Sequence, residues 1–364
     1  MQEKYYMGRF EIFFVVLNIT AFKIITGYTR IFFEISGPAA FISAATVGVV
    51  VFLADLFLFW LFKKTSTIPP EEILDYAFGH FCARAVKILF VIYFILTAAV
   101  LLRYSAEFVI AVAFPTAPAA FAAIFIIIGA VICAAQGFDA IVRTHAVVVP
   151  IFFAAIFILL IMSSPKSEIS NLSPYLGYGA AQTFGKCFKG VGLYGSAASI
   201  FMLFPFAKSK KSFKKTAIFA SAVGVLIIAA FILLFAAEND FTLAAETENP
   251  VFQMVKNVSA GQFFRRMDGY FMYIGAASAV LIISLNIFFS SYLIASEGKT
   301  EKIRPFNYSI GFIVLFLSLI PKNFGSLYRL EQAAAPWIFL AATVIPAAAL
   351  WLAARKKKAL GRKI

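Results

Sequence analysis

Charged residues are scarce in this chain of 364 residues: they make up 14% of it, against 62% for apolar residues. A water-soluble domain contains nearer a quarter of charged and half of apolar residues. An apolar excess of this size requires lipid around it, which excludes an ordinary soluble protein. The sequence therefore predicts an all-α polytopic membrane protein.

Residues suited to catalysis or metal binding are also few. Only two histidines, His80 and His145, are present, and neither lies near a plausible nucleophile or a cluster of metal ligands. The three cysteines, Cys82, Cys133 and Cys187, have no C-x-x-C spacing and are expected to be buried or loop thiols. We therefore expect no enzymatic activity, no metal and no cofactor.

Acidic residues are outnumbered by basic ones, which gives the chain a formal charge of +14. The Lys and Arg residues flank the apolar runs and do not gather in one polar domain, so they do not indicate a nucleic-acid partner. Anionic headgroups of membrane lipids explain them better.

Apolar runs long enough to cross a membrane occur ten times. A helix needs about 20 residues to span ~30 Å of hydrocarbon at ~1.5 Å per residue. The predicted spans cover residues 10–33, 39–62, 88–112, 119–136, 146–162, 185–206, 216–236, 269–295, 306–320 and 333–353. Residues 1–364 thus form a single membrane domain, with a large outer loop at 237–268 and a basic tail at 354–364.

The positions of Lys and Arg predict the orientation. With the N-terminus inside, the inner segments hold 21 basic residues and the outer segments hold six. Positive loops stay on the cytoplasmic side of a membrane. An even number of spans then places both termini in the cytoplasm.

Two of the predicted spans are interrupted by small and polar residues. The first contains Thr20, Lys23, Thr26, Gly27 and Thr29, and the sixth is rich in glycine between 185 and 195. Glycine alone is also typical of close helix packing. However, the two interrupted spans are five apart, which favours a 5+5 inverted-repeat, leucine-transporter-like fold with broken helices 1 and 6. The two repeats would be 10–162 and 185–353, with a substrate site at the breaks, where backbone groups lack helical partners.

The glycines at 190, 192 and 195 also match the pattern G-x-G-x-x-G. A dinucleotide site needs this pattern after a strand and an acidic residue about 20 positions later. Lys214 and Lys215 stand at that distance, and the surrounding sequence is apolar. The pattern therefore does not indicate a nucleotide site.

Charges inside spans are costly, about 2.5 to 3.5 kcal/mol each on insertion scales, and so indicate function or pairing. Two pairs lie four residues apart and are expected to pair within one helix: Arg30 with Glu34 and Arg103 with Glu107. Lys23 and Asp55 have no such neighbour. Lys23 could bind a ligand carboxylate, substitute for a coupling cation, or form an internal ion pair with Asp55.

The eighth span carries a polar stripe that includes Ser284 and Asn286. Such residues either join helices through hydrogen bonds or line a cavity. Both interpretations remain open from the sequence.

Several segments, in order, resemble a known family. They include TG in the first span, SGPAAFISAATVG opening the second, LLRYSAEFVI and FPTAP closing the third, GFDAIVRTHAVVVPI after the fourth, and NLSPYLGYG before the sixth. LFPFAKSKKSFKK follows the sixth span, and NPVFQMVKNVSAGQFFRRMDGYFM leads into the eighth. Together they resemble the B subunits of endospore germinant receptors, the GerAB-type spore germination permeases of the amino acid, polyamine and organocation transporter superfamily. The family usually has an acidic residue shortly after the glycines of the sixth span, where this chain reads YGSAAS.

The resemblance implies a non-enzymatic receptor subunit in the inner membrane of a spore. It implies binding of a small nutrient, often an amino acid, and action together with an A-type subunit and a lipoprotein C-type subunit. An amino-acid transporter, perhaps coupled to a cation through Lys23 or Asp55, is the alternative. The cavity residues that the resemblance implies are Thr26, Gly27, Leu102, Gly192, Tyr194, Gly195 and Ser284.

Overall fold

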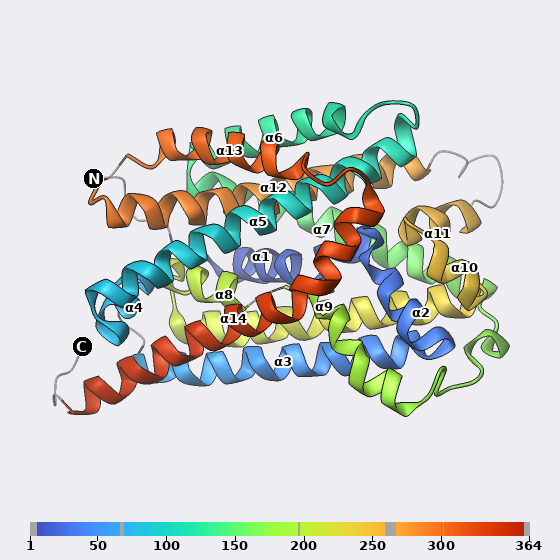
Figure 1. The fold of residues 1–364 in the computed structure, drawn as a ribbon, viewed down its shortest axis with the longest axis horizontal. Helices are drawn as coiled ribbons and strands as arrows, with labels where there is room; N and C mark the ends of the chain where they lie inside the picture. Colours follow the sequence, from blue (N-terminus) through green and yellow to red (C-terminus); the bar gives the residue numbers. More distant parts are fainter. Residues whose placement is uncertain (1–5, 66–68, 196, 259–266, 301, 360–364) are drawn as a thin grey trace.

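The computed structural model describes residues 6–65, 69–195, 197–258, 267–300 and 302–359. Within them the secondary structure is helical, apart from turns and one isolated bridge between Met7 and Ala207. The helices lie side by side along the long axis of the molecule (Figure 1). They match the predicted spans in order: α1 (Arg9–Ala21) with α2 (Arg30–Ser36), α3 (Ala40–Thr65), α5 (His80–Ala113), α6 (Ala119–Gln136), α7 (Phe138–Ser163), α8 (Ala197–Leu203) with the turns before it, α9 (Lys210–Glu238), α12 (Met267–Glu297), α13 (Arg304–Ser318) and α14 (Phe324–Ala359).

Most of these helices are long enough to cross a membrane on their own. Among the described residues, seven helical segments have the required length and apolar character. The pair Ala181–Leu193 and Ala197–Phe206, bent by 41°, makes an eighth. The shorter helices are α1, which has 13 residues before the first break, and α13, which has 15. The prediction of an all-helical polytopic membrane protein is confirmed.

The first span is broken where the sequence predicted. Helix α1 ends at Ala21 and passes into a 3₁₀ turn, Phe22–Ile25. Thr26 is then extended, with φ −85° and ψ 150°, before the chain turns again into α2. An extended residue cannot continue the helical hydrogen bonds, so the backbone opens at this point.

The sixth span is broken in a similar way. Lys186–Leu193 form a 3₁₀ helix of eight residues, longer than the three or four residues that are usual for this structure. Tyr194 follows in an extended conformation, with φ −90° and ψ 154°, and α8 begins at Ala197. The stretch that resembled a dinucleotide motif is therefore the break of this span.

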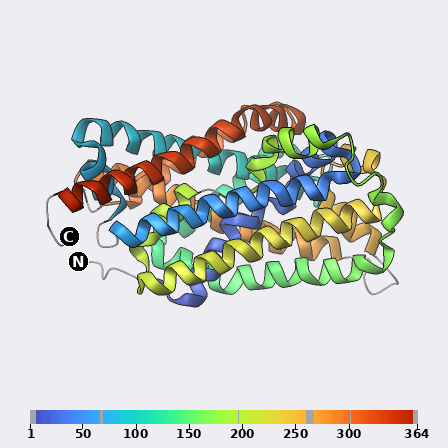
Figure 2. The same cartoon turned by 90° about the horizontal axis from the view of Figure 1, so that it is seen from below.

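Short helices cover the two ends of the bundle. Figures 1 and 2 show α4 (Pro70–Phe78) and the last turns of α14 at one end, called here the inner end after the orientation that the sequence predicts. Helices α2, α10 (Phe241–Glu246) and α11 (Pro250–Val258) lie at the opposite, outer end. The predicted spans left residues 63–87 between them as a connection, but most of that stretch belongs to α4 and to the first turns of α5.

The tenth span begins earlier than predicted. Residues 322–332 are too polar to extend the apolar run, so the sequence placed its start at residue 333. In the structure α14 begins at Phe324, because the side chain of Asn323 accepts a hydrogen bond from the Ser326 amide, 2.9 Å, and caps the helix. This extension brings Glu331 into the helix and next to the first span.

Candidate functional site

The two broken segments meet in the middle of the bundle. The Gly195 amide donates a hydrogen bond to the Thr20 carbonyl oxygen, 3.3 Å. A Cβ atom on Gly195 would lie only 2.3 Å from the Ile19 carbonyl oxygen. Only glycine allows the two backbones to approach this closely, which explains the residue type at this point of the sixth span.

Lys23 joins both breaks to a third element. Its ammonium group donates to the Gly192 carbonyl oxygen, 2.7 Å, and pairs with Glu331 of α14. The side chains of Lys23 and Glu331 are 17% and 8% exposed, so the pair is mostly removed from solvent. A backbone carbonyl at the break of the sixth span thus receives a hydrogen bond from a cation.

The far side of the Glu331 carboxylate faces aromatic hydroxyls. Tyr28 and Tyr104 lie beside this carboxylate. Its Oε2 atom and the Tyr104 hydroxyl are both buried without a well-aligned hydrogen bond in the described part of the chain, and the hydroxyl lies within interaction distance of the carboxylate. Buried polar groups normally have partners. These two groups therefore mark a place where a polar ligand atom would be stabilised.

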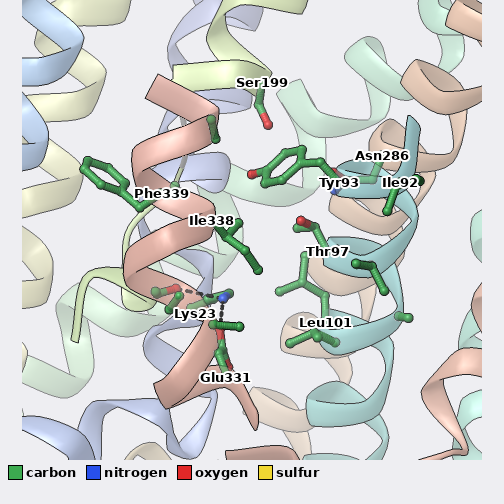
Figure 3. A pocket seen from close by; sticks show the side chains of 18 of the residues that line it. Lys23, Ile92, Tyr93, Thr97, Leu101, Ser199, Asn286, Glu331, Ile338 and Phe339 are labelled. Atoms are coloured by element: carbon green, nitrogen blue, oxygen red, sulfur yellow. Dashed lines mark hydrogen bonds and ion pairs between the residues drawn. The ribbon is translucent and has the colours of Figure 1, made fainter. Parts of the chain in front are cut away.

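A cavity of about 510 Å³ opens from this cluster. In Figure 3, Tyr93, Thr97 and Leu101 project from α5 toward α14, which carries Ile338 on the opposite wall. Lys23 and Glu331 lie at one end of the space. The walls are mostly apolar, with the charged pair at one end and a few further polar side chains, among them Thr97, Ser199 and Asn286. This combination is typical of small-molecule sites.

Four of the predicted site residues line this cavity: Lys23, Gly192, Tyr194 and Gly195. The Tyr194 hydroxyl donates to the Ala44 carbonyl oxygen of α3, 2.6 Å, which fixes the side chain across the break. The structure thus gathers these residues at one place, and their role in ligand binding remains a prediction.

The other predicted residues lie outside the cavity lining. The Thr26 hydroxyl donates to the Lys23 carbonyl oxygen, 2.6 Å, and so stabilises the turn. Gly27 faces the outer loop, because an added Cβ would lie 1.9 Å from the Glu248 carbonyl oxygen. Leu102 is fully buried in the core, and the Ser284 hydroxyl donates to Leu281 of its own helix, 2.8 Å.

Asp55 does not line this cavity. It is 3% exposed on α3 and lies beside Ser221 of α9. Lys23 pairs with Glu331 and not with Asp55. The two pairs predicted within single helices, Arg30 with Glu34 and Arg103 with Glu107, are confirmed.

The sequence analysis did not identify Glu331 or the α5 wall. Glu331 lay just outside the predicted tenth span, among other polar residues. Tyr93, Thr97 and Leu101 follow one face of α5 at helical spacing, but an apolar face of this kind is common to all spans. A buried lysine without a neighbour in its own helix was the one signal that a carboxylate had to come from elsewhere in the chain.

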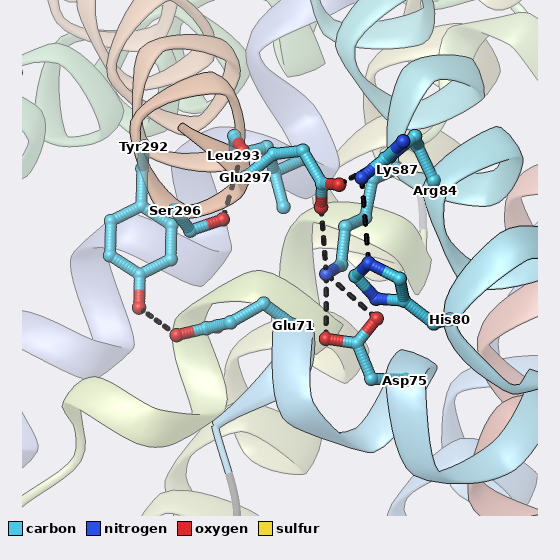
Figure 4. A network of polar contacts seen from close by, with 9 residues as sticks. All are labelled: Glu71, Asp75, His80, Arg84, Lys87, Tyr292, Leu293, Ser296 and Glu297. Atoms are coloured by element: carbon cyan, nitrogen blue, oxygen red, sulfur yellow. Dashed lines mark hydrogen bonds and ion pairs between the residues drawn. The ribbon is translucent and has the colours of Figure 1, made fainter. Parts of the chain in front are cut away.

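A second polar cluster, the inner network, lies at the inner end of the bundle (Figure 4). Its members come from α4, α5 and α12: Glu71, Asp75, His80, Arg84, Lys87, Tyr292 and Glu297. The Lys87 ammonium, almost fully buried, donates to both Asp75 carboxylate oxygens, 2.8 and 2.9 Å, and to Glu297, 3.2 Å. Lys356 of α14 donates to two carbonyls at the end of α4, 2.9 Å each. These contacts hold α4 across the inner end.

A membrane-spanning bundle with two broken helices and a cavity where they meet defines a transporter-type fold. Solved structures with the same fold support this class. The chain resembles a substrate-bound, outward-open Na⁺-coupled sialic acid symporter, with a TM-score of 0.64 and 14% identity over 92% of this chain and 79% of that one. It also resembles MhsT in complex with L-phenylalanine, with a TM-score of 0.69 and 13% identity over 99% of this chain and 91% of that one. At such low identities the likeness concerns the fold alone, and it confirms the predicted leucine-transporter-like architecture.

The chain belongs to the spore germination protein family, whose pattern matches residues 6–325. The chain is also similar to spore germination protein KB of Bacillus subtilis (strain 168). The two are 23% identical over 279 residues, which cover 74% of this chain and 75% of that protein. Family and fold are those of permeases and transporters, and the protein is an integral membrane protein.

Proposed function

We propose that this protein is the nutrient-binding membrane subunit of a spore germinant receptor. It binds a small molecule, an amino acid, in the cavity at the two breaks, and binding triggers germination. The observation that carries this proposal is the pair of opposite charges, Lys23 and Glu331, at the end of an apolar cavity. Family membership and the related spore germination protein support it.

The charged pair suits a zwitterion. A ligand carboxylate would bind Lys23, and a ligand ammonium would bind Glu331 through its Oε2 atom and the Tyr104 hydroxyl. The apolar walls would receive the ligand side chain. Since both charges already face each other, an incoming zwitterion replaces one set of ionic contacts with another and leaves no buried charge unpaired.

The receptor assembly extends beyond this chain. We expect A-type and lipoprotein C-type subunits as partners in the inner membrane of the spore, with both termini of this chain in the cytoplasm. Arg9, at the start of α1, contacts Ser212 at the start of α9, and Lys356, near the end of α14, contacts α4. These contacts are consistent with the start of α1 and the end of α14 lying on the same side of the membrane. Ligand binding would shift a conformational equilibrium that the partner subunits detect.

Calorimetric titration of the purified protein with a panel of amino acids, nucleosides and sugars tests the ligand class. We expect an amino acid to bind, and Glu331→Gln and Gly192→Trp to weaken its binding at least tenfold. A Cβ on Gly192 would lie 2.8 Å from Ala335 and 3.1 Å from the Tyr28 ring, so a Trp side chain would fill the end of the cavity. Asp139→Asn is the matched control, because that carboxylate pairs with Arg143 near the inner surface. Unchanged binding in both cavity variants would refute the proposed site.

Germination assays test the receptor role. Spores that lack this protein, and whose redundant receptors have been removed, should not respond to the nutrient that binds in vitro. Normal germination of such spores with every nutrient would refute a sensor function.

A transporter is the second candidate function, because the solved structures with this fold include a Na⁺-coupled symporter. Purified protein in liposomes would then accumulate labelled amino acid against a gradient. In that case Lys23, already bound to the Gly192 carbonyl, would take the place of a coupling cation. Accumulation in liposomes, combined with normal germination of deletion spores, would favour transport over sensing.

A further inference from the structure

The mouth of the cavity lies on the side of the bundle, between α5 and α14. Its rim residues are apolar and exposed on both helices: Leu89, Ile92 and Leu96 on α5, and Ile338 and Ala341 on α14. They lie in the middle parts of two helices that run from one end of the bundle to the other (Figure 1). The middle part of a membrane-spanning helix lies at the level of the hydrocarbon. The cavity therefore opens toward lipid tails and not toward water.

The walls near this mouth provide little for a polar occupant. Thr97 and Tyr93 carry hydroxyl groups on α5, whereas the charged lining residues, Lys23 and Glu331, lie at the other end and bind each other. The apolar surface next to the mouth offers water few hydrogen-bond partners. An empty space would forfeit the dispersion contacts of the side chains that line it.

A membrane offers two apolar occupants, a helix of a partner protein and an acyl chain of a lipid, and the volume of the cavity distinguishes between them. One turn of an α-helix, about 10 to 12 Å wide and 5.4 Å long, fills about 400 to 600 Å³. The cavity of about 510 Å³ could therefore hold a single turn, whereas a spanning helix of a partner has about 20 residues. A narrow, unbranched chain can enter the same space lengthwise.

The geometry points to an acyl chain of a membrane phospholipid as the occupant of this mouth. The chain enters between Leu96 and Ile338, contacts Thr97 and Leu101, and seals the nutrient site from the side. It covers the apolar wall next to the mouth, and the wall next to Lys23 and Glu331 stays free for the side chain of the nutrient. Because the headgroup stays at the membrane surface, no charged atom of the lipid needs to enter the bundle.

Photo-crosslinking tests this assignment. The full chain is reconstituted in phosphatidylcholine vesicles with a phospholipid that carries a diazirine in the middle of one acyl chain, and adducts are mapped by peptide mass spectrometry. We expect adducts at Leu101 and Ala99, which are 2% and 4% exposed and lie inside the cavity. The lipid-facing residues Leu340 and Val344 provide the positive control.

Two variants on α14 separate entry into the cavity from contact at the surface. Ala342, 4% exposed, lines the cavity, and Ala342→Trp should reduce adducts at Leu101 at least fivefold while adducts at Leu340 remain. Val344→Trp, on the lipid-facing side of the same helix, should change neither. If Ala342→Trp does not fold, Ala341→Trp at the exposed rim narrows the mouth with less effect on packing.

Adducts at Leu340 and Val344 without adducts at Leu101 and Ala99 in the unmodified protein would overturn the assignment. So would equal labelling of Leu101 in the Ala342→Trp and Val344→Trp variants. The same experiment in the assembled receptor gives a further outcome: loss of the adducts at Leu101 and Ala99 while those at Leu340 remain would assign the mouth to a partner helix, which also overturns an acyl chain as occupant.

Discussion

Lys23→Met should destabilise the protein through the carboxylate that it leaves behind. Glu331 is 8% exposed at its side chain and lies against Tyr28 and Tyr104. Removing one partner of a buried ion pair typically costs about 3 to 5 kcal/mol, because the remaining charge is neither hydrated nor paired. We expect about 3 kcal/mol, the lower end of that range, because Lys23 itself is 17% exposed.

A double-mutant cycle measures this effect. The free energy of unfolding is followed in mixed detergent micelles for Lys23→Met, Glu331→Gln and the double variant. When both charges are removed, no charge stays buried, so the double variant should lie within about 1 kcal/mol of the unmodified protein. The exposed Lys302 supplies the control, since Lys302→Met removes a lysine that faces solvent. A loss below about 0.5 kcal/mol for Lys23→Met, or a double variant that loses the sum of both single losses, would refute the reasoning.

Three further predictions concern the breaks and the inner network. Gly195→Ala should lower the free energy of unfolding by about 2 kcal/mol, because its Cβ would lie 2.3 Å from the Ile19 carbonyl oxygen. Gly185→Ala, with open space around it, should be neutral in the same thermal unfolding experiment. Equal melting temperatures of the two variants would contradict this. Lys87→Met should destabilise by only about 1 kcal/mol, since the carboxylates that it leaves are partly exposed and Glu297 keeps Arg84 as a partner; an unfolding curve that overlays that of the unmodified protein would exclude a structural role. Amino-acid binding should be equal in sodium and choline chloride, because Lys23 already supplies a cation at the breaks; a tenfold gain in affinity with sodium would disprove it.

The architecture could be predicted because its causes are local in the sequence. A run of about 20 apolar residues forms a helix in a membrane whatever its neighbours are, so the spans were found to within several residues. The two breaks were found for a related reason: Thr26 interrupts one apolar run, and the glycines around Gly192 interrupt the other. The division into repeats at 10–162 and 185–353 stays a prediction.

The cavity could not be predicted in the same way, because helix rotation decides which side chains face it. Leu101 lines the cavity and Leu102 does not, although both are leucines in the same turn of α5. Ser284 and Asn286 both bond to carbonyls of their own helix, yet only Asn286, two residues later, lies in the lining. One residue corresponds to a rotation of about 100° in a helix of 3.6 residues per turn. The orientation of each helix depends on packing, which the apolar pattern of a membrane span hardly constrains, since lipid and protein interior are equally apolar.

The partner of Lys23 shows where sequence reasoning stops. A lysine in the middle of a span requires an anion, and the sequence offered Asp55 on the adjacent span as the nearest candidate in the chain. The structure places Asp55 against α9, and Glu331, 308 positions away from Lys23, completes the pair. The acidic residue that the family usually has after the glycines of the sixth span is missing here, and a carboxylate reaches the same break from α14. What physical chemistry dictates is a negative charge near the ammonium group; the helix that carries it is chosen by tertiary packing.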